Sequence, residues 1–397
     1  MQFFQILIEK GDTSMVVMPL TAIVVGIFAL FARNQYKRAK ETVSLNGKAT
    51  NGHMRGYWVF VGITIAILAS VAGLRYFVGT DFGGYYNNFE HWADSLSTRV
   101  AEWDEPMLSI IARILYIFTD DGAYFIFTTA AITVFLILFT IARYTDDYFF
   151  AVMLYIFSSC WNGCFNGVRQ FLAVAILFAG HRLIYKRKFI PFCFVVFLAA
   201  SAHTTALIML PMYFLITEKL DYKKIIFIFV VGIVLIYSYD ILFRLIGVMK
   251  DSETGGADTQ YAQNEIHPLR VAIAFAPVAL YILLRIQNVQ FTGEENFYMG
   301  FVFVRFAFVF GTLNSAYLNR ASMYFSPFIP LAMCFLLRKF EPKQQTVMKI
   351  LVMILYAYVW YSIDVTNIGH WDWMFEREND KYVEGFRDSD VRIIFSR

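Results

Sequence analysis

The sequence predicts an all-α polytopic membrane protein that forms a single integral membrane domain over residues 1–397. Composition is the first reason: 58% of the 397 residues are hydrophobic, 16% are charged, and the mean hydropathy is +0.53. Soluble domains have about 25% charged and 45–50% apolar residues. The second reason is that apolar runs of membrane-spanning length recur along the chain. The third is that basic and acidic loops alternate. The net charge of +3 is small, so nucleic acid is not an expected partner.

A helix needs about 20 apolar residues to cross the hydrocarbon of a bilayer. By this criterion the sequence predicts roughly twelve spans, near 14–32, 57–77, 122–142, 147–163, 166–184, 189–202, 204–217, 225–248, 268–286, 297–316, 321–338 and 348–364. The segments 189–202 and 204–217 are too short to span individually, so we expect a hairpin of broken helices that lines a cavity. Segment 105–118 carries Arg113. It is predicted to be a re-entrant or interfacial helix within an outer loop over 78–121.

Lysine and arginine counts in the short loops predict the orientation of the spans. Four loops are basic and would all lie on the cytoplasmic side: 33–55, 182–188, 219–224 and 338–349. The segments 78–105 and 250–267 are acidic and would lie outside. Both termini then lie outside as well, which makes 365–397 an extracytoplasmic tail. No cleavable signal peptide is expected, because the first apolar run follows charged residues and has no obvious cleavage site.

Arg169 lies inside an otherwise apolar run, Phe165–Gly180. A guanidinium there costs several kcal/mol unless it is paired, reaches a headgroup or lines a wet cavity. Its planar fork also matches a phosphate with two parallel hydrogen bonds. Its neighbours are small or polar: Asn166, Gly167 and Gln170. Arg75 and Arg320 lie at the ends of two other spans. The pattern predicts an enzyme that handles a phosphorylated, lipid-linked substrate. The alternatives are a structural ion pair at Arg169 and interfacial anchoring by the other two arginines.

Other polar residues are predicted at the same outer face, namely Asp81, Glu105 and His203, and together with the arginines they indicate an outward-facing polar cavity. Each also has a structural alternative. The two carboxylates could be solvated loop acids, and the histidine could bond to a backbone carbonyl in the core. Tyr85, in the outer loop, could stack on a sugar ring.

Soluble-enzyme signatures are missing from the sequence, including the phosphate-cradling GxxxxGK[ST] loop, HExxH and GxSxG. The four cysteines lie in or beside apolar segments with no neighbouring metal ligands, so we interpret them as packing residues and expect neither a metal site nor a cofactor: Cys160, Cys164, Cys193 and Cys334. No internal repeat is evident, which argues against inverted-repeat transporters.

Taken in order, several short motifs resemble the EpsG family of polysaccharide polymerases, a branch of the Wzy-like proteins. They are Arg75, Asp81–Tyr85, Glu105–Pro106, Phe165–Ala173, Ala199–Pro211 and Asn319–Phe325. The resemblance covers about residues 57–338. It implies a fold similar to membrane glycosyltransferases of the GT-C type. It also implies polymerisation of oligosaccharide units carried on undecaprenyl diphosphate, for capsule, exopolysaccharide or O-antigen, at the outer face of the bacterial cytoplasmic membrane.

The reaction so implied needs charge stabilisation of a leaving diphosphate and a base for the acceptor hydroxyl. We expect Arg169 and Arg320 to bind the diphosphate, with Arg75 as a third contact and Gln170 as a supporting donor. His203 is the natural base, although Glu105 or Asp81 could serve instead. Expected partners are the lipid-linked donor and acceptor, membrane lipid, and a chain-length regulator and a flippase of the pathway. The competing hypotheses are a flippase or transporter of lipid-linked sugars and an O-antigen ligase-like glycosyltransferase.

Overall fold

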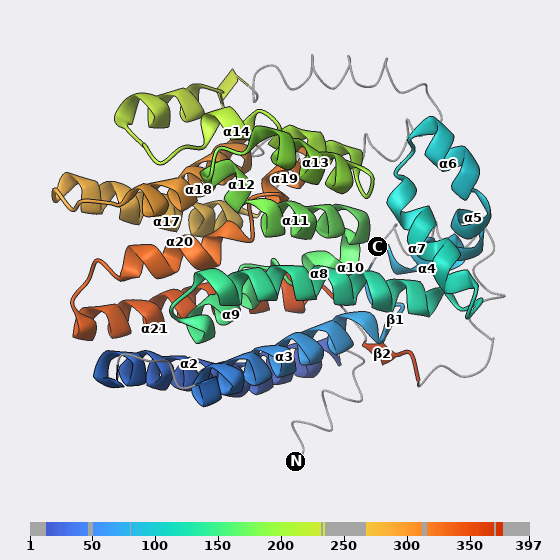
Figure 1. Ribbon diagram of the computed structural model, residues 1–397, viewed down its shortest axis with the longest axis horizontal. Helices are drawn as coiled ribbons and strands as arrows, with labels where there is room; N and C mark the ends of the chain where they lie inside the picture. Colours follow the sequence, from blue (N-terminus) through green and yellow to red (C-terminus); the bar gives the residue numbers. More distant parts are fainter. Residues whose placement is uncertain are drawn as a thin grey trace.

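The computed structural model describes residues 13–46, 51–79, 81–231, 233–234, 267–311, 316–368 and 371–375. These residues form a bundle of helices that run roughly along one direction, with a group of short helices at one end (Figure 1). The predicted outer loop 250–267 lies outside the described residues except for His267. Of the predicted span 225–248 only the first part is described, and of the predicted tail 365–397 only 365–368 and 371–375.

Six helices are long and apolar enough to cross a membrane among the described residues: Ser14–Thr42, Gly52–Gly73, Gly122–Tyr144, Val168–Tyr185, Pro268–Ile286 and Pro342–Val365. They correspond to α2 (Ser14–Asn46), α3 (Asn51–Gly73), α8 (Gly122–Tyr144), α11 with α12 (Val168–Gly180, Arg182–Tyr185), α17 (Pro268–Ile286) and α21 with the π-helix η3 (Pro342–Val359, Trp360–Val365). The predicted all-α membrane fold is therefore confirmed.

The remaining predicted spans fall on shorter or more polar elements, so the number twelve stays a prediction. They are α9 (Tyr148–Phe157), α10 (Gly163–Asn166), α13 (Phe189–Ala200), η1 (Thr204–Met209), α14 (Met212–Leu215), α18 (Gly293–Gly311), α19 (Ala316–Met323) and α20 (Phe328–Leu337). Turns interrupt most of these segments. The break predicted for the hairpin is present, because α13 ends at Ala200 and a 3-10 helix and one short helical turn follow. The chain returns, since Arg187 before α13 donates to the Tyr213 and Ile216 carbonyls. That the hairpin lines a cavity stays a prediction.

Local sequence signals explain where several helices begin. The Asp121 carboxylate accepts a hydrogen bond from the Ala123 amide at the start of α8, and Asp147 does the same for Phe150 at the start of α9. Proline occupies the first turn of α17 and α21, where no amide hydrogen is needed. These local signals define where the four helices begin.

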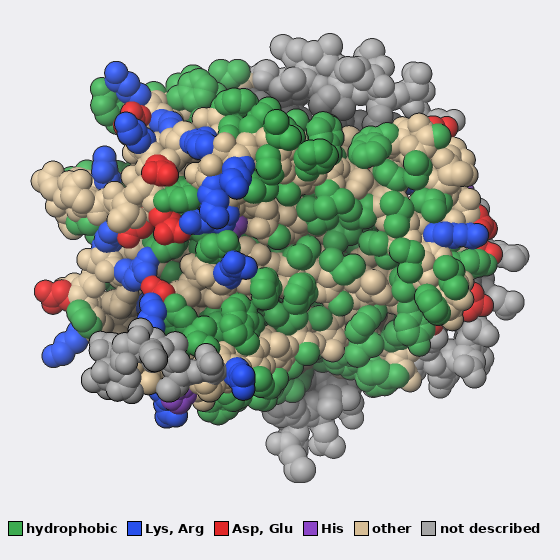
Figure 2. Space-filling model, in the orientation of Figure 1, with side chains coloured by type: hydrophobic (Ala, Val, Ile, Leu, Met, Phe, Trp, Pro, Cys, Tyr) green, Lys and Arg blue, Asp and Glu red, His purple; other side chains and the backbone are tan. Residues whose placement is uncertain are grey.

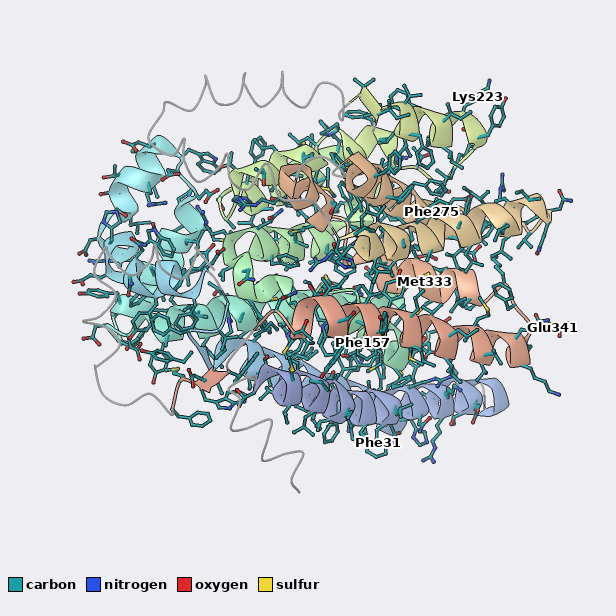
Figure 3. All side chains as sticks on the ribbon, turned by 180° about the vertical axis from the view of Figure 1, so that it is seen from behind. Phe31, Phe157, Lys223, Phe275, Met333 and Glu341 are labelled. Atoms are coloured by element: carbon teal, nitrogen blue, oxygen red, sulfur yellow. The ribbon has the colours of Figure 1, made fainter. Side chains whose placement is uncertain are left out.

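Basic side chains gather at one end of the bundle (Figure 2). Lys223 and Glu341, on segments far apart in sequence, both lie at this end (Figure 3). Ion pairs link the elements there: Asp146 contacts Lys40 at 2.9 Å and Arg338 at 2.7 Å, and Asp147 contacts Lys349 at 2.7 Å. The basic loops predicted to share one side of the membrane therefore do lie together in the structure.

A group of four short helices, here called the cap, covers the opposite end of the bundle (Figure 1). Its helices are α4 (Phe82–Asn87), α5 (Phe89–Asp94), α6 (Leu96–Glu102) and α7 (Pro106–Tyr116). A separate aromatic core holds the cap together and includes Phe82, Tyr85, Phe89 and Trp92. Burial of such rings stabilises the cap without help from the lipid. The predicted re-entrant or interfacial helix is α7, and it packs against α5 and α6.

A two-stranded antiparallel ribbon fastens the cap end to the described part of the tail. Strand β1 (Arg75–Tyr76) pairs with β2 (Asp372–Trp373), with Arg75 opposite Trp373. The Met374 amide also donates to the Leu74 carbonyl at 2.8 Å. The ribbon thus places the end of α3 and the start of the cap beside residues nearly three hundred positions later.

Candidate functional site

The candidate site lies at the cap end of the bundle and is organised around Glu105. This residue precedes α7 and has left-handed backbone torsions, φ 48° and ψ 54°, which cost free energy in a residue other than glycine. Pro106 begins the helix directly after it. The Met107 amide donates to the Ser201 carbonyl at 2.9 Å, which joins the start of α7 to the end of α13. The packing of two distant elements therefore sets the position of the carboxylate.

Both oxygens of the Glu105 carboxylate are engaged. Oε1 accepts from His203 Nδ1 at 2.8 Å and from the Thr204 amide at 3.1 Å. Oε2 accepts from the Arg169 guanidinium at 2.7 Å. The three partners are 64, 98 and 99 positions away in sequence. One buried carboxylate thus connects the cap, the start of α11 and the turn before η1.

These contacts keep Glu105 ionised. Burial acts to raise its pKa, but the hydrogen bond from His203, the charge of Arg169 and the Thr204 amide outweigh it and lower the pKa to about 2. An ionised carboxylate can only accept hydrogen bonds, so Nδ1 of His203 must carry the hydrogen. In the neutral imidazole, Nε2 is then the nitrogen able to take up a proton.

Arg169 is in the first turn of α11, directly after Gly167 and Val168. Its guanidinium is paired with Glu105 on one side, yet 45% of the side chain is exposed, whereas the Glu105 side chain is only 8% exposed. Tyr85 of the cap is a second neighbour: burial raises the pKa of its hydroxyl, and the nearby Arg169 charge opposes that rise. Arg169 is thus held in place and still presents charge to the surroundings.

Gln170, buried beside Arg169, connects the site to α19. Its side-chain amide donates to the backbone carbonyl of Arg320 at 2.5 Å. The side chain of Arg320 is exposed. One helical turn further along, the Tyr324 hydroxyl is 2.7 Å from the Thr205 hydroxyl, which follows His203 and Thr204. The predicted residues Arg169, Gln170, His203, Glu105 and Arg320 therefore come together at one end of the molecule.

Arg75 has a different environment from the one a phosphate contact needs. Its side chain is fully buried. The guanidinium donates to the carbonyls of Ala72, Val78, Cys164 and Phe165, and it lies over the Phe165 ring at 5.0 Å. Burial lowers the pKa of Arg75 to about 10. The expectation of a third diphosphate contact is therefore revised, because four carbonyl oxygens already occupy this guanidinium. Arg75 instead joins the end of α3 to α10.

The other predicted residues, Asp81, Asn166 and Tyr85, lie on the segments next to Arg75 and Arg169. Asp81 precedes α4 and is close enough to Arg75 to act on its charge. Asn166 is exposed at the end of α10. Tyr85 is only 7% exposed and packs against Trp92 with ring centres 5.6 Å apart, so neither ring presents a face for a sugar. Stacking by Tyr85 is accordingly revised to a role in holding Arg169.

Three charged residues that the sequence analysis did not select also lie inside the bundle: Arg270, Arg305 and Asp364. A signal for Arg305 was available, because it interrupts the apolar run of the predicted span 297–316 as Arg169 interrupts its own. Arg270 and Asp364 lie near predicted span ends, where charged residues are common. Only the packing of α17 against the end of α21 shows that they are paired.

Among the described residues, no group of three or more His, Cys, Asp and Glu side chains is placed to hold a metal ion. Cys160, Cys164 and Cys334 are buried and Cys193 is half-buried.

Comparison with known families matches residues 58–372 to the EpsG family. No curated protein and no solved structure matches the chain. The matched region contains every element of the candidate site and most of the helical bundle. It also contains the motifs on which the resemblance was based, so the resemblance is confirmed. The chain therefore belongs to the EpsG family and is a multi-pass membrane protein of the polysaccharide-polymerase type.

Proposed function

We propose that this protein polymerises oligosaccharide repeat units carried on undecaprenyl diphosphate. In this reaction a hydroxyl oxygen of the incoming unit bonds to the anomeric carbon of the growing chain. The bond from that carbon to the diphosphate oxygen breaks, and the lipid diphosphate leaves with the electron pair. The hydroxyl proton passes to a base. The site therefore has to stabilise a developing negative charge and accept one proton.

The observation that carries this proposal is the network in which Glu105 holds both Arg169 and His203. Arg169 keeps nearly half of its side chain exposed, so its guanidinium can contact the departing diphosphate. His203 Nε2 takes up the acceptor proton, and Glu105 fixes the orientation and tautomer of the ring. Arg320, on the neighbouring helix, provides a second positive charge. In this proposal Arg169 stabilises the negative charge of the leaving diphosphate and His203 accepts the proton. Glu105 holds both side chains.

The orientation of the site also supports the proposal. The basic end of the bundle would face the cytoplasm by the positive-inside rule. The Glu105 network lies at the opposite end, under the cap, and would then face the exterior of the cytoplasmic membrane. Lipid-linked repeat units would reach this side after translocation. A flippase would instead need charged groups distributed along a path between the two faces.

The decisive experiment uses purified protein in lipid nanodiscs with a synthetic lipid-diphosphate repeat unit, and gel analysis of the products. The wild-type protein is expected to give a ladder of polymers. Arg169→Lys keeps the charge but loses the planar fork, so polymer formation should fall by about a hundredfold or more while single units remain. Arg113→Lys, at an exposed arginine of the cap, is the matched control and should leave the ladder unchanged.

A normal ladder from Arg169→Lys would exclude the phosphate role. If the wild-type protein gives no ladder but moves a fluorescent lipid-linked unit between the leaflets of a vesicle, it is a flippase.

His203→Gln tests the second role. The amide can still donate to Glu105, but it cannot act as a base, so turnover should fall by about a hundredfold with little change in substrate affinity. Steady-state kinetics separate the two quantities. Loss of affinity with unchanged turnover would show that His203 only binds the sugar.

A further inference from the structure

A second cluster of charged residues lies within the bundle, on elements other than those that hold the Glu105 network. It consists of Arg270 near the start of α17, Arg305 in α18 and Asp364 in the π-helix η3. Arg305 lies six residues before the last described residue of α18, or about 9 Å along its axis. The cluster is therefore in the half of the bundle that is closer to the cap.

The contacts within this cluster leave one arginine without a carboxylate. Arg270 donates to Asp364 Oδ1 at 2.6 Å, and the Ser159 hydroxyl donates to Oδ2 of the same group. Within the part of the chain that the structure describes, the hydrogen bond of Arg305 is to the Ser326 hydroxyl, at a long 3.4 Å. Arg270 is close enough for its charge to act on Arg305. Of these two neighbouring guanidinium groups, only that of Arg270 is paired with a carboxylate among the described residues.

An excess positive charge at this depth is costly. An arginine among membrane helices needs a partner, a headgroup or water, and a buried ion pair by itself stabilises a protein little. Replacement of a buried ion pair by apolar residues of similar volume is often neutral or stabilising. An anion that enters the cluster would balance the second guanidinium, and a phosphate would fit the fork of each arginine.

Unsatisfied polar atoms line the same region. Asn162 accepts a hydrogen bond from Trp360 at 2.9 Å through Oδ1, yet among the described residues its buried Nδ2 has no acceptor, and neither does the Ser158 hydroxyl. Ser158 directly precedes Ser159, which contacts Asp364, and Asn162 follows Ser159 by three residues. Buried donors without partners cost about 1–3 kcal/mol each, so they favour a ligand that brings oxygen acceptors. A phosphate group brings several.

We propose that Arg270, Arg305 and Asn162 form a second anion site, which holds the diphosphate of the second lipid-linked substrate; this assignment rests on the function proposed above. Polymerisation brings two lipid diphosphates into one protein, and their like charges repel. Two separate cationic sites would keep them apart while their sugars meet. The α19–α20 segment contributes to both sites, because the Arg320 carbonyl bonds to Gln170 and the Ser326 hydroxyl to Arg305.

Binding stoichiometry tests this proposal independently of polymerisation. The full-length protein in phosphatidylcholine nanodiscs is titrated calorimetrically with farnesyl diphosphate and, separately, with inorganic pyrophosphate. We expect two farnesyl diphosphate molecules per wild-type protein. Arg305→Met should lose one of them or bind it on the order of tenfold to a hundredfold more weakly. Arg169→Met should keep the second site, and the double variant should bind neither.

Two equal sites in Arg305→Met would overturn the second site and leave the Arg169 proposal standing. If Arg305→Met loses a binding site and Arg169→Met loses none, the second site stands and the Arg169 proposal is overturned. If Arg305→Met does not fold, Arg305→Lys keeps the charge and should show intermediate weakening. Nanodiscs that also contain phosphatidylglycerol identify the source of the anion. Displacement of farnesyl diphosphate from the second site by phosphatidylglycerol at comparable concentration would overturn its assignment to a lipid diphosphate.

Discussion

At the scale of single residues, Glu105 links three distant segments of the chain and organises the candidate site. It is buried, and it accepts from Arg169, His203 and the Thr204 amide. Because these contacts lower its pKa to about 2, the carboxylate remains charged at neutral pH. The same contacts orient the Arg169 and His203 side chains, to which the proposed function gives the binding and the base roles. A change at Glu105 should therefore affect stability and activity together.

Glu105→Gln removes the charge with almost no change of shape. The folded pKa of about 2 lies below the ordinary value of 4.5. The ionised Glu105 carboxylate therefore stabilises the folded state fully above pH 4.5, and this stabilisation is lost as the pH falls towards 2. It amounts to about 3 kcal/mol at most. We expect the variant to unfold at a lower temperature than wild type near neutral pH, and the difference to shrink in acid.

Thermal unfolding of detergent-purified protein between about pH 3 and pH 8 measures this difference. Asp104→Asn, at a neighbouring exposed carboxylate, is the matched control and should show little change. A difference between Glu105→Gln and wild type that does not vary with pH would contradict the assignment.

At the scale of elements, the short connection between α3 and the cap positions the start of α11. Arg75 donates to carbonyls of Cys164 and Phe165, and Gly79 lies against the same segment. Gly79 has φ +94°, and a Cβ there would be 2.5 Å from Asn166 Oδ1 and 2.9 Å from the Phe165 carbonyl oxygen. Only glycine combines this torsion with this close approach. The connection is thus a positioning element for Arg169.

Gly79→Ala should lower stability by about 1–3 kcal/mol through backbone strain and should displace the start of α11. We expect a lower unfolding temperature and a reduced rate of polymer formation. Gly84→Ala is the control, because Gly84 is helical and a Cβ there meets no atom within 4 Å. Equal unfolding temperatures for the two variants would show that the contact at Gly79 is not needed.

At the scale of the whole molecule, the two ends of the bundle differ in chemistry. One end carries most of the basic side chains and the ion pairs of Asp146 and Asp147 (Figure 2). The other end carries the cap and the candidate site. A membrane that enforces the positive-inside rule would hold the protein in one orientation. Under the proposed function, this orientation would place the candidate site outside the cytoplasm.

The orientation can be measured with single cysteines in a Cys193→Ala background, since the three other cysteines are buried. Ser97→Cys lies in the cap and Lys343→Cys at the basic end, and both positions are exposed. In intact cells a membrane-impermeant thiol reagent should label Ser97→Cys immediately. It should label Lys343→Cys only after permeabilisation. The opposite pattern would place the candidate site in the cytoplasm.

The sequence by itself determined the fold class and the grouping of polar residues at one end. Both follow from local properties, because apolar length, loop charge and helix-start signals act over a few residues. Arg169 also stood out locally, as a charge inside an apolar run. The motifs of the family indicated Glu105 and His203, although not that they touch.

Only the tertiary structure decided which of these residues meet and which are exposed. Arg75 and Arg169 were both expected to bind phosphate, but the contact of Arg75 with α10 buries its guanidinium among carbonyls, whereas the Arg169 side chain is left 45% exposed. The pairing of Arg270 with Asp364, 94 positions apart, is equally invisible in the sequence. Burial and ion pairing depend on contacts between distant segments, and no local pattern specifies them.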